Sequence, residues 1–361
     1  MKLISTILFC WCIATAALAQ TKPYRSDSVQ FKNAAGTINF GGTLTTPVKN
    51  NTHIAIVIVS GTGKQDRDGK MSGHLWFANL ADYFGHKGIS VLRLDDRGVG
   101  QTTGAYENST TADFAADALE AVAYLKSRND LGLKKIGLLG HSEGGAGISI
   151  AAAQSKDVAF LISLAGLATS GVDAQIIQNL EGVAALDMPE YNKKRFNEIN
   201  EIMFRTAFKY ADSANMDAKL KEAHAAWKKR DSIAVKALNL KSDRFGFPIY
   251  LYALNAVTPW YRYFIKYDPE NYLPKVKIPI LAINGSSDSW VKPGPNLANW
   301  KALPLKGGNK KVTVVEIPGL NHLLQHCVTC LPQEYATIKE DIAPEVLSTL
   351  DAWLKHNNLG K

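Results

Sequence analysis

Short apolar runs alternate with longer amphipathic segments along most of the chain. After the first 20 residues, the most hydrophobic run covers residues 53–59. Other apolar runs have the length of buried strands, at residues 89–94, 136–139, 158–164, 278–284 and 311–318. Helices are predicted between them at residues 75–86, 111–127 and 144–154, with a last one at residues 344–356. This alternation is typical of a parallel sheet covered on both faces, so we expect an α/β fold with a mostly parallel central sheet.

Two β-like stretches, residues 29–33 and 37–45, precede this pattern, and a long insertion interrupts it. About a hundred residues, 166–268, lie between two predicted strands, far more than one crossover needs. Apolar residues recur in it at helical spacing, as at Phe196, Ile199 and Met203 and at Leu220, Ala223 and Trp227. We expect a helical cap above the C-terminal edge of the sheet, where lids exclude water and select substrates.

The insertion ends in an aromatic-rich stretch, Tyr250, Tyr252, Trp260, Tyr261, Tyr263 and Phe264. Aromatic residues at such spacing are more often core than pocket. We nevertheless expect some of these rings to line a binding site, and the sequence does not indicate which ones.

The strongest chemical signal is the motif Gly140-His141-Ser142-Glu143-Gly144, placed between an apolar run and a small-residue helix. A glycine-flanked serine in this strand-to-helix context is a nucleophile elbow. The glycines allow a crowded turn that lifts the hydroxyl above the sheet. Ser142 is therefore predicted to be a nucleophile.

A serine nucleophile requires a base and an acid, and in this fold class they follow it in the order acid, then histidine. Asp288 follows the predicted strand 278–284, and His322 follows the strand 311–318. Both strands would end at the same edge of the sheet as Ser142, where ligands bind in open α/β sheets. We expect His322 to act as general base and acid, and Asp288 to orient it.

The loop after residues 53–59, Ser60-Gly61-Thr62-Gly63, is predicted to donate one backbone N–H to an oxyanion hole. We favour Thr62 as this donor, with Gly63 as the alternative, and expect the backbone N–H of Glu143 to be the second. A pair between Arg67 and Asp66 or Asp68 would hold the loop in shape; a solvated polar loop is the other interpretation. We expect Asp95, Asp96 and Arg97 to be structural.

These motifs, in this order, resemble the α/β-hydrolase superfamily, and within it the bacterial branch of serine aminopeptidase-like and acyl-esterase hydrolases. The resemblance covers nearly all of the chain after residue 20. It implies that Ser142, Asp288 and His322 form a catalytic triad, without a metal or cofactor. It is less specific for the substrate, because one fold supports many reactions. The segment Cys327-Val328-Thr329-Cys330 is not expected from the family.

Residues 1–19 have the features of a secretory signal peptide. Lys2 precedes an apolar run that ends in Ala17-Leu18-Ala19, a small-x-small cleavage signal. Residues 20–361 would then form the mature catalytic domain, periplasmic or secreted and without a membrane anchor. Cleavage would leave Cys327 and Cys330 as the remaining cysteines, and an oxidising compartment favours a disulfide between them. Two free buried cysteines are the alternative, and a zinc site that includes His322 and His326 would compete with catalysis.

The formal net charge of +8 is moderately basic, but no clustered basic stripe or nucleic-acid-binding motif accompanies it. The partner we expect is a small ester or short peptide. The leading function is hydrolysis of carboxylic esters, with short acyl chains, through an acyl-enzyme on Ser142. An exported aminopeptidase or peptidase is the main alternative, because the same machinery cleaves amides. A non-catalytic binding protein is disfavoured, since such a protein would usually have lost a triad member.

Overall fold

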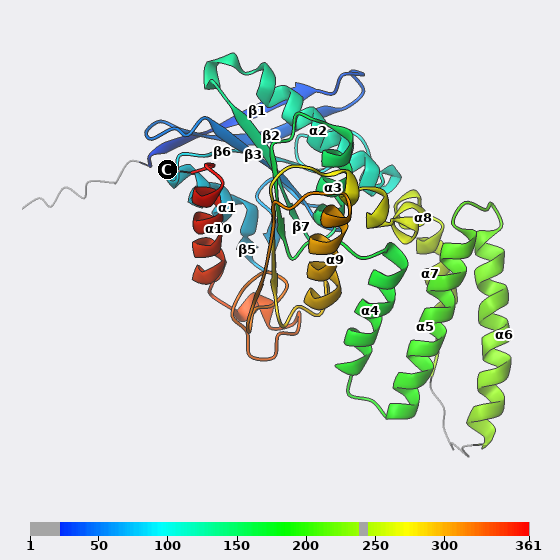
Figure 1. Ribbon diagram of the computed structural model, residues 1–361. Coiled ribbons are helices and arrows are strands. Elements are labelled where there is room, and N and C mark those ends of the chain that lie inside the picture. Colours follow the sequence, from blue (N-terminus) through cyan, green and yellow to red (C-terminus); the bar gives the residue numbers. More distant parts are fainter. Residues whose placement is uncertain (1–21, 238–244, 361) are drawn as a thin grey trace, which may run out of the picture.

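The computed structural model describes residues 22–237 and 245–360. The predicted signal peptide, residues 1–19, lies outside the described residues. In the described part, helices cover both faces of an eight-stranded sheet (Figure 1). The expected α/β architecture is confirmed.

The sheet has the strand order β1-β2-β6-β3-β7-β8-β9-β10. Strands β1 and β2 form an antiparallel hairpin, β2 pairs antiparallel with β6, and the other pairs are parallel. Their bounds are β1 Tyr24–Lys32, β2 Asn39–Pro47, β3 Ile54–Val59, β6 Ser90–Leu94, β7 Lys135–His141, β8 Phe160–Leu164, β9 Ile280–Gly285 and β10 Val312–Ile317. A separate small hairpin joins β4 Lys70–Met71 to β5 His74–Leu75. The parallel strands place the loops after β3, β7, β9 and β10 at one edge.

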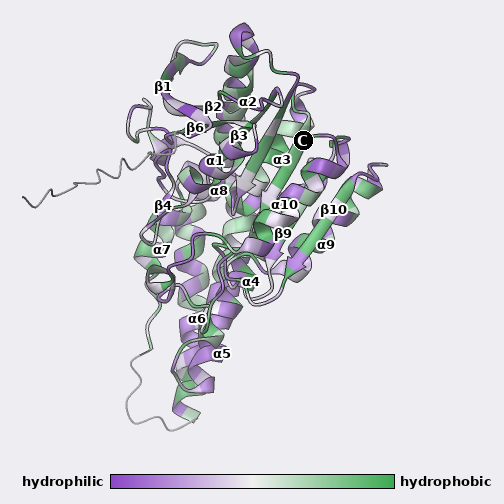
Figure 2. Cartoon of the chain, turned by 90° about the vertical axis from the view of Figure 1, so that its left-hand side faces the viewer, coloured by the Kyte–Doolittle hydropathy of each residue, from purple (hydrophilic) through white to green (hydrophobic). Residues whose placement is uncertain are grey.

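Two apolar clusters attach the helices to the two faces of the sheet. One contains residues of α2 Thr111–Ser127, α3 Gly144–Gln154 and α9 Pro293–Lys306, and the other residues of α1 Trp76–His86 and α10 Pro344–His356. Figure 2 shows the apolar character of strands such as β9 and β10 between these layers. The helix α9 was not predicted, because its three prolines and one glycine weaken the helical pattern.

The described part of the region between β8 and β9 is mainly helical. It contains α4 Gly171–Ala184, α5 Glu190–Tyr210, α6 Met216–Ala237, α7 Ile249–Ala256 and α8 Pro259–Lys266. Ile199, Met203, Leu220 and Trp227 are buried in its own apolar cluster. Short 3₁₀ helices at Pro269–Asn271 and Leu273–Lys275 lead back toward β9, and three more lie at Tyr106–Asn108, Asn129–Leu131 and Tyr335–Thr337. Helix α8 contacts both α4 and α2, so it links the helical insertion to the helices that cover the sheet.

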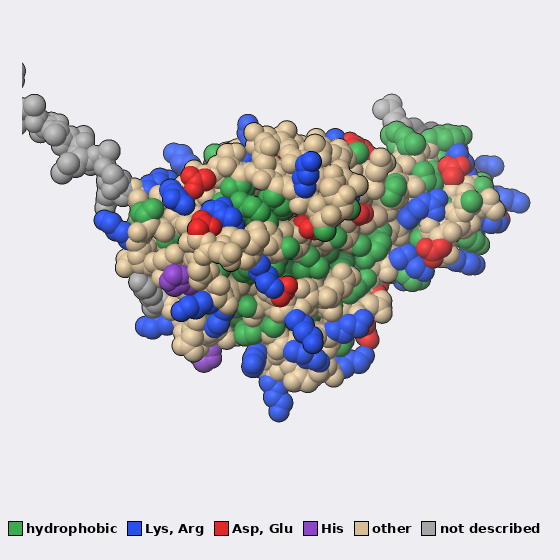
Figure 3. All heavy atoms as spheres, turned by 90° about the horizontal axis from the view of Figure 1, so that it is seen from above, with side chains coloured by type: hydrophobic (Ala, Val, Ile, Leu, Met, Phe, Trp, Pro, Cys, Tyr) green, Lys and Arg blue, Asp and Glu red, His purple; other side chains and the backbone are tan. Residues whose placement is uncertain are grey.

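The surface gives no indication of a charged stripe on the face in Figure 3, where Lys and Arg side chains are scattered and interspersed with Asp and Glu. None of the helices within residues 22–237 and 245–360 combines the length and the hydropathy that crossing a membrane requires.

Candidate active site

Ser142 lies in a sharp turn between β7 and α3, with a φ of 57°. The turn is crowded on both sides. A Cβ on Gly140 would lie 2.3 Å from the carbonyl oxygen of Gly144, and a Cβ on Gly144 would lie 2.4 Å from that of Val59. Both positions therefore require glycine, which is the physical reason for the motif's spacing.

Asp288 and His322 are brought together by the loops after β9 and β10. Nδ1 of His322 lies 2.8 Å from Oδ2 of Asp288. The other carboxylate oxygen, Oδ1, accepts hydrogen bonds from the backbone N–H groups of Trp290 (2.8 Å) and Val291 (2.9 Å), and the Asn284 amide donates to Oδ2 at 3.2 Å. With Nδ1 donating to the carboxylate, Nε2 of His322 carries the free lone pair that a general base needs.

Two cavities meet at Ser142. The first, which we call the histidine-side cavity, has a volume of about 300 Å³ and is lined by Ser142, His322 and Tyr335 among others. The second, the cap-side cavity, has a volume of about 310 Å³ and is lined by Ser142 together with Trp260 and Phe264 of the cap. The His322 side chain hydrogen-bonds to Asp288, and among the described residues no hydrogen bond joins it to Ser142.

The backbone N–H groups of Thr62 and Glu143, beside Ser142, have no acceptor among the described residues. Both residues line the cap-side cavity with Ser142. The N–H of Gly63, the alternative donor, is already used, because it donates to the Tyr106 hydroxyl at 2.7 Å. Glu143 also occupies the N-cap position of α3, without a side-chain capping hydrogen bond, at a helix end that favours negative charge. The geometry therefore favours Thr62 and Glu143 as an anion-binding pair.

The loop that carries Thr62 is held by the loop after β6, and this differs from the expected pairing within the loop itself. Arg67 binds Asp95, with its Nε 3.0 Å from Oδ1, whereas Asp68 pairs with Arg93. Asp66 instead accepts the backbone N–H of Asp68 at 3.0 Å. The expectation of an Arg67 pair with Asp66 or Asp68 was wrong, because the nearly buried Asp95 offers a less solvated partner.

Asp96 holds the same loop from a second point. Its carboxylate accepts hydrogen bonds from the Ser60 hydroxyl (2.7 Å) and the Gln65 backbone N–H (2.8 Å). Burial raises the pKa of Asp96 to about 7, against the opposing effect of these two donors. Arg97 pairs with Asp113 and Asp117 of α2. In the structure, Asp95, Asp96 and Arg97 all make contacts that hold loops and helices in place.

Several site residues were missed at the sequence level. Trp290 lines both cavities, and its ring centroid lies 5.0 Å from that of His322. Nε2 of His141 lies 3.1 Å from the backbone oxygen of His322. Burial and the nearby His322 lower the pKa of His141 to about 3, so its ring is neutral and Nε2 donates to that oxygen. Trp290 follows Asp288 by two positions, a proximity that could have identified it.

Of the aromatic stretch at the end of the cap, Trp260 and Phe264 line the cap-side cavity. Tyr261 is buried in the apolar cluster of the cap, whereas Tyr250 is exposed. Neighbouring rings of α8 therefore differ in their surroundings: Tyr261 packs in the core of the cap, whereas Trp260 and Phe264 line the cavity.

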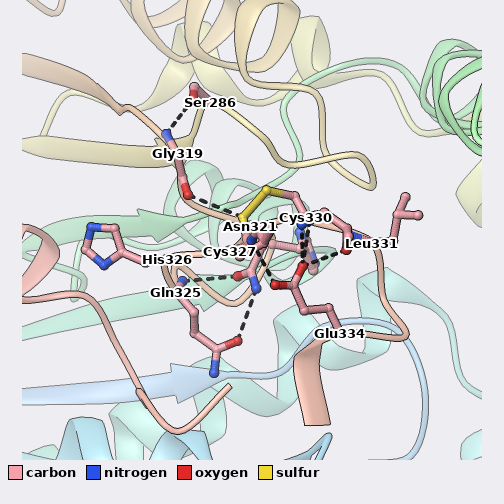
Figure 4. The surroundings of a disulfide bond; sticks show 12 residues. Ser286, Gly319, Asn321, Gln325, His326, Cys327, Cys330, Leu331 and Glu334 are labelled. Atoms are coloured by element: carbon pink, nitrogen blue, oxygen red, sulfur yellow. Dashed lines mark hydrogen bonds between the residues drawn. A yellow bond between two sulfur atoms is a disulfide. The ribbon is translucent and has the colours of Figure 1, made fainter. Parts of the chain in front are cut away.

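Cys327 and Cys330 are joined by a disulfide in the loop after His322, with 4.9 Å between their Cα atoms (Figure 4). The Glu334 carboxylate accepts the backbone N–H groups of Val328, Thr329 and Cys330 and thereby closes this loop. The bonded sulfurs are not thiolate ligands, and the described residues contain no group of three or more side chains suited to hold a metal. The next residue, Tyr335, accepts the backbone N–H of His322 at 3.4 Å.

Comparison with known proteins places this geometry in a family. The family model of the alpha/beta hydrolase fold matches residues 54–326. Esterase EstD from Thermotoga maritima is 24% identical over 299 residues, which are 82% of this chain but 61% of that protein. The chain thus spans less than two thirds of that relative's length.

Solved structures agree at the level of the fold. The Pyrococcus furiosus esterase Pf2001 superposes with a TM-score of 0.54 at 15% identity, covering 92% of this chain and 93% of that one. The α/β hydrolase GrgF from Penicillium sp. sh18 gives a TM-score of 0.53 at 17% identity, over 92% and 99% of the two chains. Together with the family model, which covers most of the sequence, these matches show that the chain belongs to the α/β-hydrolase fold family.

Proposed function

We propose that this protein is an exported serine hydrolase that cleaves carboxylic esters of short acyl chains through an acyl-enzyme on Ser142. The observation that carries the proposal is the meeting of three elements at one site. These are an elbow serine, a histidine bonded to a buried aspartate, and two backbone N–H groups without an acceptor in the described structure. The similarity to EstD supports ester substrates.

In the proposed reaction, Nε2 of His322 takes the proton of Ser142 while Oγ attacks the ester carbonyl carbon. The carbonyl oxygen becomes an oxyanion and is bound by the N–H groups of Thr62 and Glu143. The C–O bond then breaks, and the alcohol leaves with the proton from His322. Water repeats these steps on the acyl-enzyme and releases the carboxylic acid.

The same chemistry indicates which part of the ester occupies each of the two cavities. The leaving oxygen receives its proton from His322, so the alcohol belongs in the histidine-side cavity, which His322 lines. The acyl group then belongs in the cap-side cavity, which Trp260 and Phe264 line. At about 310 Å³ this cavity is at the lower end of small-molecule sites, which supports short acyl chains.

The direct test compares the purified wild-type protein with Ser142→Ala on p-nitrophenyl butyrate and on aminoacyl p-nitroanilides. We expect esters to be the better substrates and Ser142→Ala to lose on the order of 10⁴- to 10⁶-fold in rate. A fluorophosphonate probe should label the wild type alone. Ser155→Ala is the matched control, because Ser155 lies at the C-terminal end of α3, the helix that follows Ser142. Activity above a tenth of wild type in Ser142→Ala would refute the nucleophile, and faster amide cleavage would favour a peptidase.

Export needs its own test, because it rests on the sequence of residues 1–19. Expression in a bacterial host followed by osmotic-shock fractionation should place the protein in the periplasmic fraction. Intact-mass measurement should show a chain that begins at Gln20. A protein that keeps Met1 and stays with the cytoplasmic fraction would contradict export.

A further inference from the structure

The Glu143 side chain has a role that the proposed reaction does not use. It is 4% exposed, and no described Lys, Arg or His forms an ion pair with it. Its carboxylate accepts hydrogen bonds from the Thr62 hydroxyl (2.6 Å), the Thr111 hydroxyl (2.5 Å) and the Trp260 indole N–H (2.9 Å). Burial raises the pKa of Glu143, and these three donors oppose the rise. Burying a carboxylate without a cation is costly, so its presence at this site calls for a functional reason.

The three donors come from three separate parts of the molecule. Thr62 lies on the loop after β3, Thr111 is the first residue of α2, and Trp260 is on α8 of the cap. The carboxylate therefore joins the anion-binding loop, the body and the cap at one point, one residue from Ser142.

We propose that the Glu143 side chain is a positioning residue that fixes the two oxyanion donors relative to each other and links their position to the cap. This inference rests on the proposed function. The backbone N–H of Glu143 is one donor, and its carboxylate holds the side chain of Thr62, whose backbone N–H is the other. Gly61 and Gly63 on either side of Thr62 have no side chain that could hold the loop.

The link to the cap runs through Trp260. Its ring lines the cap-side cavity and stacks on Phe264 with a centroid distance of 5.2 Å, while its N–H reaches Glu143. An acyl group that fills this cavity therefore contacts the residue that holds the Glu143 carboxylate. Acyl groups that fill the cavity should favour the correct placement of the oxyanion donors, an effect on kcat rather than on KM.

The test exploits two threonines that donate the same type of hydrogen bond to the same carboxylate. Thr62→Val removes the hydroxyl beside the oxyanion hole but keeps the backbone N–H. We expect kcat to fall about 10- to 100-fold with KM within about threefold, because a misplacement of about 1 Å costs on the order of 100-fold. Thr62→Ser restores the hydroxyl and should recover most of this loss. Thr111→Val should lower the melting temperature similarly but kcat far less.

Trp260→Phe tests the cap side, because it keeps an aromatic ring and removes the N–H. We expect it to lower kcat for butyryl esters more than for acetyl esters. Equal losses of kcat in Thr62→Val and Thr111→Val, or wild-type kcat in Thr62→Val, would overturn the inference. If Ser142→Ala stays active, the proposed function itself fails. If Ser142→Ala is inactive while Thr62→Val is unimpaired, only the positioning role of Glu143 fails.

Discussion

The imidazole of His322 donates from Nδ1 to Oδ2 of Asp288 at 2.8 Å, and the two side chains are 1% and 0% exposed. Burial at this level keeps water from competing for the bond, so the orientation of the ring is set by the protein. Two backbone N–H groups bound to the other carboxylate oxygen keep Asp288 from rotating.

This arrangement predicts a large effect of Asp288→Asn. An amide has one acceptor oxygen and one donor NH₂ group, so it cannot accept at both positions at once. The amide NH₂ group then faces either Nδ1–H of His322 or the backbone N–H groups of Trp290 and Val291, and it cannot accept from them. If it faces His322, the imidazole takes the tautomer with its proton on Nε2, which cannot act as the base. We expect kcat to fall on the order of 10⁴-fold, the size found when the triad Asp becomes Asn in serine proteases, with the fold intact. Asp130→Asn, at an exposed position, is the control for kinetic measurement. A loss below tenfold would point to another acid.

Asp96 predicts a pH-dependent contribution to stability. Burial raises its pKa from 3.8 to about 7, so the folded protein binds an extra proton between these values. The contribution of Asp96 to the free energy of unfolding is then fully present below about pH 4 and is lost as the pH rises through about 7. Asn cannot ionise. The free energy of unfolding of Asp96→Asn should therefore improve relative to wild type between about pH 5 and pH 8.

Urea denaturation of wild type and Asp96→Asn at about pH 5 and about pH 8 measures this difference in the free energy of unfolding. Asp157→Asn, which removes an exposed carboxylate, corrects for general charge effects. A gap between Asp96→Asn and wild type that is the same at both values would mean that Asp96 does not titrate in this range.

The size of the cap-side cavity predicts a preference for acyl length. Esters of two to six carbons should be cleaved faster than those of twelve to sixteen, since a cavity of about 310 Å³ leaves little room for a long chain. Phe264 is 6% exposed and lines it, so Phe264→Ala should shift the optimum toward longer chains. A p-nitrophenyl ester series gives the profile. Faster cleavage of the long esters by wild type would indicate a lipase.

The disulfide predicts a catalytic effect larger than its effect on stability. Its ring is short, so the loop-closure gain is below the roughly 3 kcal/mol of a 15-residue loop. The ring is nevertheless connected through Glu334 to Tyr335, which contacts the backbone of His322. We expect the Cys327→Ser/Cys330→Ser variant to lower kcat more than the melting temperature.

Thiol alkylation with intact-mass measurement shows whether the bond forms in the exported protein. Two alkylated cysteines without prior reduction would exclude it. A double variant with wild-type kcat would show that Glu334 alone is sufficient to hold the loop.

The sequence predicts where Ser142, Asp288 and His322 lie, because each of them is in the loop that follows a parallel apolar strand. Parallel strands end at one edge, so strand context alone places Ser142, Asp288 and His322 close together. Partners that approach from other segments were not predictable in this way. Arg67 binds Asp95 across 28 positions, and the Trp260 indole reaches Glu143 across 117. Such contacts depend on tertiary packing, which leaves no local pattern in the chain.

Local composition also misled in one place. Helix α9 contains Pro304 in its interior, which weakens a helical pattern. It forms nevertheless, because Trp300 packs into the core and Asn296 accepts the N–H groups of Ala168 and Thr169. Burial outweighs propensity in this helix.

Strands β8 and β9 are neighbours in the sheet, with Leu161 beside Ile280 in register, although the whole helical cap lies between them in the sequence. A segment inserted between adjacent strands can be replaced as one cassette, because the order and pairing of the strands do not depend on its length. In evolution or in the laboratory, such an exchange would carry Trp260 away with the old cap. An incoming cap that offers no donor at that position would leave the Glu143 carboxylate short of one hydrogen bond.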